Sequence, residues 1–180
     1  MAVALRTSRL LLREWRDDDY APFAAMWADP EVMRYFYRPS ADRAASDAWI
    51  DRMRMHNDTH GFAYWAVELS GSDPLIGAIG LTRVLSPALR FAPAVEIGWR
   101  LAQRYWGRGY AAEAARAVLD DGFGRFAFTE IVAFTVPANR RSWRLMERLG
   151  MTRDPADDFD HPAVPEGHEL RRHILYRLRR

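Results

Sequence analysis

The hydrophobic positions of the chain repeat with two different periods, and the changes of period divide the sequence into strands and helices. Short alternating or continuous apolar runs predict strands, and apolar residues three or four apart predict amphipathic helices. The pattern predicts about seven strands, at residues 8–14, 61–69, 75–84, 94–101, 129–136, 151–159 and 170–178. It also predicts about four helices, at residues 17–27, 41–56, 110–123 and 140–149, with a short helical turn at residues 31–37.

The order of these elements predicts an α+β fold. Helices alternate with strands, but several neighbouring strands look antiparallel, and residues 61–69 and 75–84 form a predicted hairpin. We therefore expect a mixed, mostly antiparallel central sheet flanked by helices. Gly77 and Gly80 in the second hairpin strand predict a bulge or a close approach of another backbone. The sequence shows no repeat and no linker, so we expect residues 1–180 to form a single domain.

Composition excludes several classes of function. The 49% hydrophobic and 28% charged residues are typical of a globular protein, and no apolar run is long enough for a membrane helix or a secretory leader. We therefore expect a cytoplasmic protein that does not bind membranes. The absence of cysteine excludes a disulfide, a thiol nucleophile and an acyl-cysteine intermediate. The histidines show no metal-ligand spacing, so we expect no metal.

Arginine supplies all 26 of the Lys and Arg positions, although the net charge is only +2. Without lysine, the chain has no side-chain amine to act as a base or to form a Schiff base. The arginines are spread among acidic residues, whereas a nucleic-acid-binding protein concentrates them on one element with aromatic residues between. We therefore expect no nucleic-acid partner.

The segment from Arg104 to Gly109 is a candidate anion-binding loop. It follows a predicted strand, precedes a predicted helix, and contains Gly107 and Gly109 flanked by arginines. Glycine lets backbone N–H groups turn towards a ligand, and a helix start adds unpaired N–H groups and the positive end of its dipole. Turn glycines beside surface arginines would give the same spacing without any site.

Two motifs carry a resemblance to a known family. The spacing Arg104-x-x-Gly107-x-Gly109 resembles the acetyl-coenzyme A (acetyl-CoA) pyrophosphate loop of the GCN5-related N-acetyltransferases (GNAT). The segment from Asn139 to Met151 looks like the second cofactor segment of that superfamily. The residues around Glu96, the loop and the spacing Asn-x-x-Ser are similar to one branch, the ribosomal-protein-alanine (RimJ/RimL-like) acetyltransferases. The resemblance covers nearly the whole chain and implies a sheet with splayed central strands.

The resemblance implies acetyl transfer from acetyl-CoA to an amine through a ternary complex. By position, backbone groups of the strand before the loop would hold the pantetheine arm and the thioester, and loop residues would hold the pyrophosphate. Asn139 would bridge the cofactor arm, and Ser142 would contact the sulfur. The cofactor-binding residues expected in this way are Trp99, Arg100, Leu101, Arg104, Trp106, Gly107, Arg108, Gly109, Tyr110, Ala111, Asn139 and Ser142.

Glu96 is the first candidate for the general base. It precedes the thioester-binding backbone on the predicted central strand, and partial burial would raise its pKa usefully. The alternative is that Glu96 pairs with one of the many arginines, since structural ion pairs also perturb carboxylates. His60 and His168 are further candidates of suitable pKa, although solvated or capping histidines are commoner.

Ser142 is the candidate acid. Many members of the superfamily place a tyrosine seven residues after the motif asparagine, and this chain has Met146 there, which donates no proton. The resembled branch has serine three residues after the asparagine, as at Ser142. The alternative is a first-turn serine that only satisfies the backbone. Tyr105 and Tyr176 remain reserve donors.

The sequence leaves three hypotheses of function open, and the first two differ in the acceptor. The first is the α-amine of a peptide or protein N-terminus, which needs little help because its pKa is only about 7.7–8.0. The second is a small amine such as an antibiotic, a polyamine or an amino acid, for which Asp42, Asp47 and Glu68 would have to converge on a pocket. The third is a catalytically silent CoA-binding module. The sequence leaves monomer and homodimer open.

The resemblance also implies that the region before the main part of the sheet covers the acceptor site. Met33, Tyr35, Phe36 and Tyr37 are candidates to line an acceptor pocket there. The alternative is that these side chains simply pack the helices on the sheet.

Overall fold

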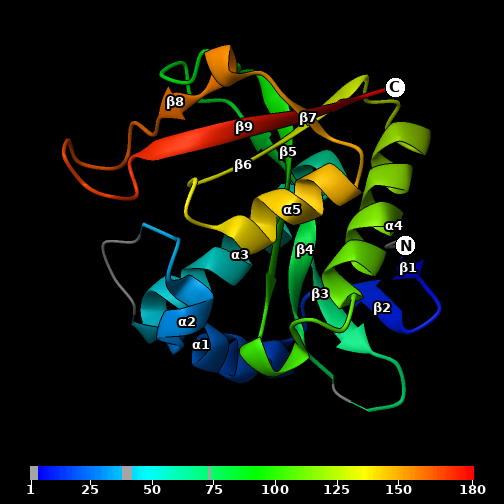
Figure 1. Cartoon of the computed structure of the whole chain (residues 1–180). Coiled ribbons are helices and arrows are strands. Elements are labelled where there is room, and N and C mark those ends of the chain that lie inside the picture. The colour runs from blue at the N-terminus through cyan, green and yellow to red at the C-terminus, as the bar shows by residue number, and fades with distance from the viewer. Residues whose placement is uncertain (1–3, 38–41, 73) are drawn as a thin grey trace.

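The computed structural model describes residues 4–37, 42–72 and 74–180, so Pro39, Ser40 and Ala41, predicted at the start of a helix, lie outside the described residues. The described strands form one mixed sheet in the order β1-β2-β3-β4-β5-β6-β9-β7, with β8 paired to β9 (Figure 1). Their bounds are β1 Leu5–Arg6, β2 Leu10–Arg13, β3 Tyr64–Leu69, β4 Gly77–Val84, β5 Ala94–Leu101, β6 Glu130–Thr135, β7 Thr152–Arg153, β8 Phe159–Asp160 and β9 Arg172–Arg179.

Five α-helices accompany the sheet in the described chain: α1 Tyr20–Ala28, α2 Pro30–Met33, α3 Arg43–His60, α4 Tyr110–Gly124 and α5 Arg140–Arg148. Asp42 caps the start of α3 with its side chain, and Gly61 ends the helix in the left-handed conformation. None of the described helices is long and apolar enough to span a membrane.

The alternation of side chains along the strands separates two cores. On one face, Trp65, Ile79 and Ile97 pack with residues of α4 and α5. On the other face, Ala66 and Ala78 pack with the aromatic residues of α1 and α3. Since successive strand residues point to opposite faces, Glu96, Gly98 and Arg100 share the second face with α1–α3.

The sheet divides at its centre. Strands β4 and β5 are antiparallel neighbours along their whole length, from Gly77↔Leu101 to Val84↔Ala94. Strands β5 and β6 are parallel and share a single registered pair, Glu96↔Val132. Beyond this pair the two strands diverge, which confirms the predicted splay and opens a slot between the two halves of the sheet.

Three predicted elements differ from the structure. The strand predicted at residues 151–159 is divided into β7, a 3-10 turn at Pro155–Asp157 and β8, because Pro155 starts the turn and Asp154 caps it. The predicted helix at residues 17–27 begins as a 3-10 turn over Asp17–Asp19, and the short helical turn expected at residues 31–37 is limited to α2.

Candidate functional site

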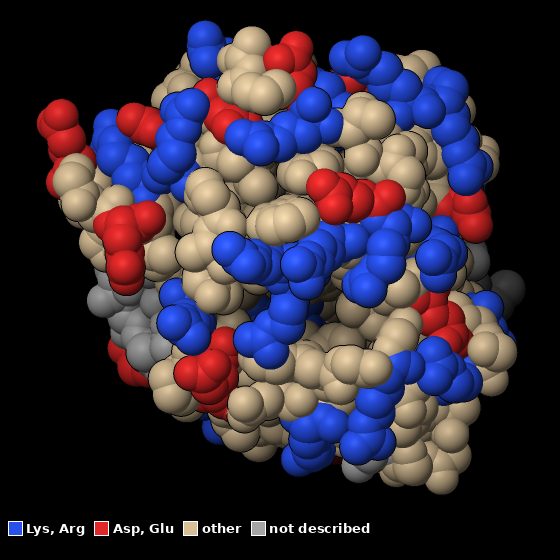
Figure 2. Space-filling view, in the orientation of Figure 1, with Lys and Arg blue, Asp and Glu red and all other residues tan. Residues whose placement is uncertain are grey.

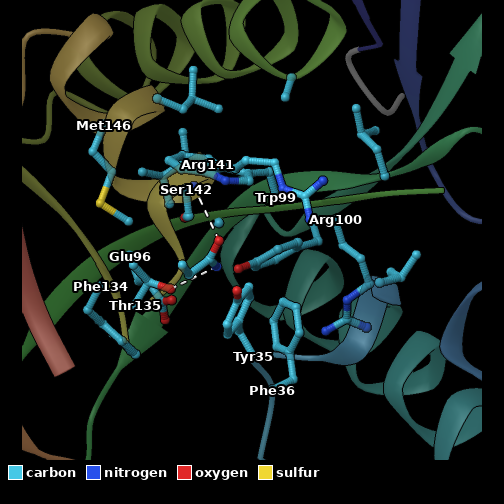
Figure 3. Close-up of a pocket in the computed structure, with 18 of the residues that line it drawn as sticks. Tyr35, Phe36, Glu96, Trp99, Arg100, Phe134, Thr135, Arg141, Ser142 and Met146 are labelled. Atoms are coloured by element: carbon cyan, nitrogen blue, oxygen red, sulfur yellow. Dashed lines mark hydrogen bonds between the residues drawn. The ribbon is translucent and has the colours of Figure 1, made fainter. Parts of the chain in front are cut away.

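A large cavity occupies the slot between the two halves of the sheet. Its volume is about 940 Å³, and its wall includes the ends of β5 and β6, the loop before α4, one side of α5 and the segment after α2. Figure 3 shows Ser142 above Glu96 and the rings of Tyr35 and Phe36 below them, so that all four surround the same space. The cavity therefore reaches both faces of the sheet.

The loop before α4 presents a row of unused backbone donors to this cavity. Residues 107–112 carry six consecutive N–H groups that donate to no backbone carbonyl in the described chain. Gly107 and Gly109 have φ angles of 74° and 82°, a left-handed conformation that glycine adopts without strain. Both glycines and the first residues of α4 line the cavity. The positive end of the helix and these donors together suit an anionic group.

Two side chains attach this loop to the sheet. The Trp106 indole Nε1 donates a hydrogen bond of 2.8 Å to the carbonyl of Leu101, at the end of β5. Arg9 Nη1 donates a bond of 3.0 Å to the carbonyl of Arg108. The C=O and N–H of a trans peptide group point in opposite directions, so fixing the Arg108 carbonyl also fixes the direction of the Gly109 N–H.

Arg9 is held in turn by Glu113 in the first turn of α4. The Glu113 carboxylate accepts bonds from Thr7 Oγ1 at 2.6 Å, Ser8 Oγ at 3.0 Å and Arg9 Nε at 2.7 Å. Burial would raise the pKa of Glu113, but these hydrogen bonds outweigh it and lower the pKa to about 2. The carboxylate therefore stays ionised at neutral pH and anchors the start of β2 to the loop.

Basic side chains gather on the face that carries α5, beside a hollow in the surface (Figure 2). Besides Arg100 of β5, which the sequence analysis expected there, the cavity wall contains four arginines, namely Arg116 of α4 and Arg141, Arg144 and Arg148 of α5. Sequence reasoning missed all four, although the spacing of three and four residues along α5 places its three arginines on one side of the helix. The Arg141 guanidinium lies 3.9 Å from the centroid of the Trp106 ring.

The expected cofactor-binding residues divide into two groups. Ten of the twelve line the cavity; the other two, Arg104 and Arg108, have exposed side chains outside its wall. The Arg104 guanidinium lies 4.9 Å from the centroid of the Tyr105 ring. The fixed positive charge in the cavity wall therefore comes from Arg100 on β5 and from the arginines of α4 and α5, and the loop contributes its main chain.

Asn139 connects the end of β6 to the start of α5. Its Oδ1 accepts from the backbone N–H of Ser142 at 3.3 Å, which caps the helix, and its Nδ2 donates to Thr135 Oγ1 at 3.0 Å (Figure 3). The Ser142 hydroxyl lines the cavity and donates to no backbone carbonyl in the described chain. This geometry leaves the hydroxyl available to a ligand.

The tyrosines held in reserve lie in different places. Tyr105 is buried beneath the loop and contributes to the cavity wall. Tyr176 lies on β9 and donates to Glu147 Oε1 at 3.2 Å, away from the cavity wall. Met146, in the place where many relatives of the resembled family have tyrosine, is buried and also lines the cavity.

Glu96 lies at the point where β5 and β6 part. Its side chain lines the cavity and forms no ion pair with any arginine of the described chain. Burial raises the pKa of Glu96 to about 8. A carboxyl group with this pKa exchanges its proton near neutral pH, as a general base must.

The wall on the Glu96 face is largely aromatic. Tyr35, Phe36 and Tyr37 line it, with Glu31 beside them, whereas Met33 is buried in the core against α1 and α3. The structure therefore places the three rings, but not Met33, in the cavity wall, and their role in holding an acceptor stays a prediction.

Two histidines that sequence reasoning missed complete the far end of the wall. His161 and His173 have ring centroids 5.1 Å apart, and both pack against Phe134. Burial lowers the pKa of each, so both are neutral at pH 7. No local motif marks them, because β8 and β9 bring them together from different parts of the sequence.

The other candidate side chains lie elsewhere. His60 ends α3 and packs against His56, and His168 packs against Tyr37 outside the cavity wall. Asp47 pairs with Arg43, and Glu68 pairs with Arg13. Asp42 caps α3, so the three carboxylates named for a small-amine pocket do not converge.

Comparison with known proteins shows that the chain is similar in sequence to acetyltransferases. A sequence model described as an acetyltransferase (GNAT) domain matches residues 9–152. The Bacillus subtilis protein named YkkB is 34% identical over 148 residues, covering 82% of this chain and 84% of that protein. A protein of the same organism that is named as the uncharacterized N-acetyltransferase YnaD is 30% identical over 165 residues. The match covers 92% of this chain and 90% of that protein.

Solved structures share the fold. An acetyltransferase from Agrobacterium tumefaciens superimposes with a TM-score of 0.80 at 28% identity, covering 100% of this chain and 96% of the other. The ribosomal-protein-S5-alanine acetyltransferase of Vibrio fischeri superimposes with a TM-score of 0.77 at 18% identity, covering 98% of this chain and 96% of the other. At that identity the second likeness concerns the fold alone.

Proposed function

The chain belongs to the GNAT acetyltransferase family, and we propose that it transfers the acetyl group of acetyl-CoA directly to the α-amine of a peptide or protein N-terminus. The observation that carries the proposal is the row of N–H groups at residues 107–112, at one end of a cavity whose other end contains Glu96. One end suits a diphosphate, and the other supplies a carboxyl group that can accept a proton. Transfer from a coenzyme A thioester to an amine requires both.

The donor end fits acetyl-CoA through main-chain groups and arginine. The N–H groups of the loop would hold the pyrophosphate, and the arginines of α4 and α5 in the cavity wall would neutralise the remaining phosphate charge. Backbone groups of β5 from Trp99 to Leu101 face the slot without a registered partner in β6. They would hold the pantetheine arm by strand-like hydrogen bonds.

The chemical step needs a base, an oxyanion donor and an acid. Glu96 would accept the proton of the attacking amine, and a backbone N–H of β5 would stabilise the tetrahedral oxyanion. The Ser142 hydroxyl would donate to the departing sulfur, whose thiolate needs only a weak acid because its pKa is about 8.5, taking cysteine as the model. The chain contains no cysteine, which excludes an acyl-cysteine intermediate, and we expect the amine to attack the thioester directly.

The match of proton affinities favours an α-amine over a lysine side chain. An α-ammonium group has a pKa of about 7.7–8.0 and a lysine ammonium about 10.4. Glu96, with a pKa of about 8, is well placed to take a proton from the first and poorly placed to take one from the second.

A small amine is the second candidate acceptor. Glu31 and the rings of Tyr35, Phe36 and Tyr37 would suit a compact cation in the same wall. The two acceptor classes share the donor end and differ only in what fills the space below Glu96.

An acceptor screen tests the proposal. The purified chain is mixed with acetyl-CoA and either a panel of short peptides or a panel of small amines, and free thiol release is followed. We expect fast release with peptides that begin with a small residue, and calorimetry should show CoA binding without any acceptor. Release with small amines alone would select the second candidate. CoA binding without release in either panel would indicate a catalytically silent module, and no CoA binding would refute the proposal.

A further inference from the structure

Tyr64 reaches the reaction face of β5 from two strands away. It begins β3 and is registered with Gly80 of β4, which is registered in turn with Gly98 of β5. A Cβ atom added at Gly98 would overlap the Tyr64 hydroxyl and lie 2.8 Å from the ring carbon Cζ. The phenol therefore occupies the space that a side chain at position 98 would otherwise fill.

Gly80 makes this path possible. A Cβ atom there would overlap the backbone of Ala63 and Tyr64, so only glycine permits the approach of β3 at this point. This confirms the close approach that the sequence predicted. The Trp15 indole donates to the Tyr64 carbonyl at 2.7 Å, and Trp49 packs edge-on against the ring at 5.5 Å. Backbone and ring are thus both held.

The phenol oxygen lies between two charged positions of β5. Positions 96, 98 and 100 point to the same face, so the hydroxyl placed over Gly98 lies between Glu96 and Arg100. Tyr64, Gly98 and Glu96 all line the cavity. Burial, and to a smaller extent the charge of Glu96, raises the pKa of Tyr64, so the hydroxyl stays protonated and neutral.

The Arg100 guanidinium lies on the same face and contacts its aromatic residues. It is packed among aromatic rings, 4.3 Å from the centroid of Phe36 and 4.8 Å from that of Trp27 (Figure 3). An amine beside the slot therefore meets the Glu96 carboxyl group and the Tyr64 hydroxyl that covers Gly98.

We propose that Tyr64 is a catalytic residue on the acceptor side, whose phenol oxygen accepts one N–H of the incoming amine while Glu96 accepts another. This inference rests on the proposed acetyl transfer. A neutral primary amine has two N–H groups and one lone pair, and with both N–H groups held the lone pair points to the thioester carbon. The C–N bond forms, the C–S bond breaks and the amine proton passes to Glu96, while the departing thiolate accepts a hydrogen bond from the Ser142 hydroxyl and takes its proton from water.

The arrangement selects primary amines. A secondary amine has one N–H and satisfies either Glu96 or Tyr64, but not both, so it should react more slowly. The site would thus discriminate by the number of N–H groups, in addition to the shape of the aromatic wall.

The test compares an acceptor from the screen with its N-methyl derivative, in the wild-type chain and in Tyr64→Phe. We expect the wild type to prefer the primary amine. Tyr64→Phe should lower kcat/KM for the primary amine about tenfold, the effect of losing one hydrogen bond of ordinary strength. The same variant should lower kcat/KM for the N-methyl derivative much less, and it should leave the KM for acetyl-CoA unchanged.

Two further variants separate this role from a structural one. Gly98→Ala displaces the phenol and should reproduce the loss of discrimination. Tyr20→Phe removes another tyrosine hydroxyl, which bonds Asp51 at the surface, and should leave both rates unchanged. If Tyr64→Phe keeps the wild-type ratio of primary to secondary rates, the inference is refuted although the acetyl transfer stands. If the wild type transfers acetyl to no amine, both are refuted.

Discussion

The two ends of the cavity consist of different kinds of chemical group. The donor end consists of main-chain N–H groups and arginines, and its loop is attached to the sheet by Trp106, Arg9 and Glu113. The acceptor end consists of aromatic side chains, one carboxyl group with a raised pKa and a phenol placed over a glycine. The first end suits one highly charged ligand, and the second suits a nitrogen whose substituents are largely apolar or neutral.

The difference indicates which end should determine the affinity for the cofactor and which should determine the rate of reaction. Main-chain groups bind a phosphate whatever the surrounding side chains are, so the donor end depends on backbone conformation. The acceptor end depends on the identity of single side chains, because a carboxyl or a hydroxyl must touch the reacting nitrogen. Variants at the donor end should therefore change affinity, and variants at the acceptor end should change turnover.

The largest effect should come from Glu96→Gln. Loss of the general base should lower kcat by about 10²–10⁴-fold, the usual contribution of such a group, with the Kd of CoA unchanged. Steady-state kinetics and calorimetry measure the two quantities. A weaker Kd with unchanged kcat would reverse the division between the two ends.

Glu96→Gln should also change how kcat/KM and the stability of the fold depend on pH. In the wild type, kcat/KM should rise with pH and level off above about 8, because Glu96 must lose its proton to act. A carboxyl group whose pKa is higher in the folded chain stabilises the fold when protonated, so this contribution is lost as pH rises from about 4.3 to about 8. Glu96→Gln should remove the pH dependence of stability and leave in kcat/KM only the rise that comes from deprotonation of the acceptor amine. Thermal unfolding at several pH values provides the second measurement.

A smaller effect, confined to affinity, should follow Gly109→Ala. The residue has a φ of 82°, where an L side chain costs about 1–2 kcal/mol, so the loop should shift and the Kd of CoA should rise about five- to thirtyfold. Acceptor KM should not change. Gly124→Ala, at the far end of the same helix and in open space, is the matched control and should leave CoA binding intact.

Ser142→Ala should lower turnover about fivefold, the effect of one hydrogen bond, while CoA affinity stays constant. Ser142→Thr keeps the hydroxyl and should recover most of the rate. Single-turnover measurements separate the chemical step from product release. Equal turnover in the wild type and the alanine variant would show that the hydroxyl is not the acid.

The smallest effect should come from Arg141→Ala. Its guanidinium lies in the cavity wall against the Trp106 ring, and one exposed charge interaction with a phosphate is worth about 0.5–1 kcal/mol, so the Kd of CoA should rise about two- to fivefold. Because the interaction with phosphate is also electrostatic, the difference from the wild type should shrink as salt is added. Calorimetry at two salt concentrations checks both statements, and a difference independent of salt would contradict the second.

The same contrast explains what the sequence revealed. The donor loop is contiguous, and its glycines, the preceding strand and the following helix can be identified together from local pattern. The sheet also follows from hydrophobic periodicity, except where Pro155 interrupts the strand predicted at residues 151–159. Glu96 became a candidate base through its place on the strand before the loop, and the structure places it in the cavity wall.

The acceptor end was harder to predict because it is assembled from distant segments. Tyr64 reaches the slot only through the register of three strands, and His161 meets His173 through the pairing of β8 with β9. Met33 and Tyr35 are two residues apart, yet one is in the core and the other in the cavity wall. Such placements depend on the tertiary structure, which local periodicity does not contain.

The single registered pair between β5 and β6 has a consequence for cooperativity. Few hydrogen bonds join the two halves of the sheet, so strands β1–β5 and strands β6–β9 should behave as separate foldons under native-state hydrogen exchange. Amides that face the slot should exchange faster than those of β4 or β9. A ligand lying along both inner edges should slow both sets together and merge the two units into one.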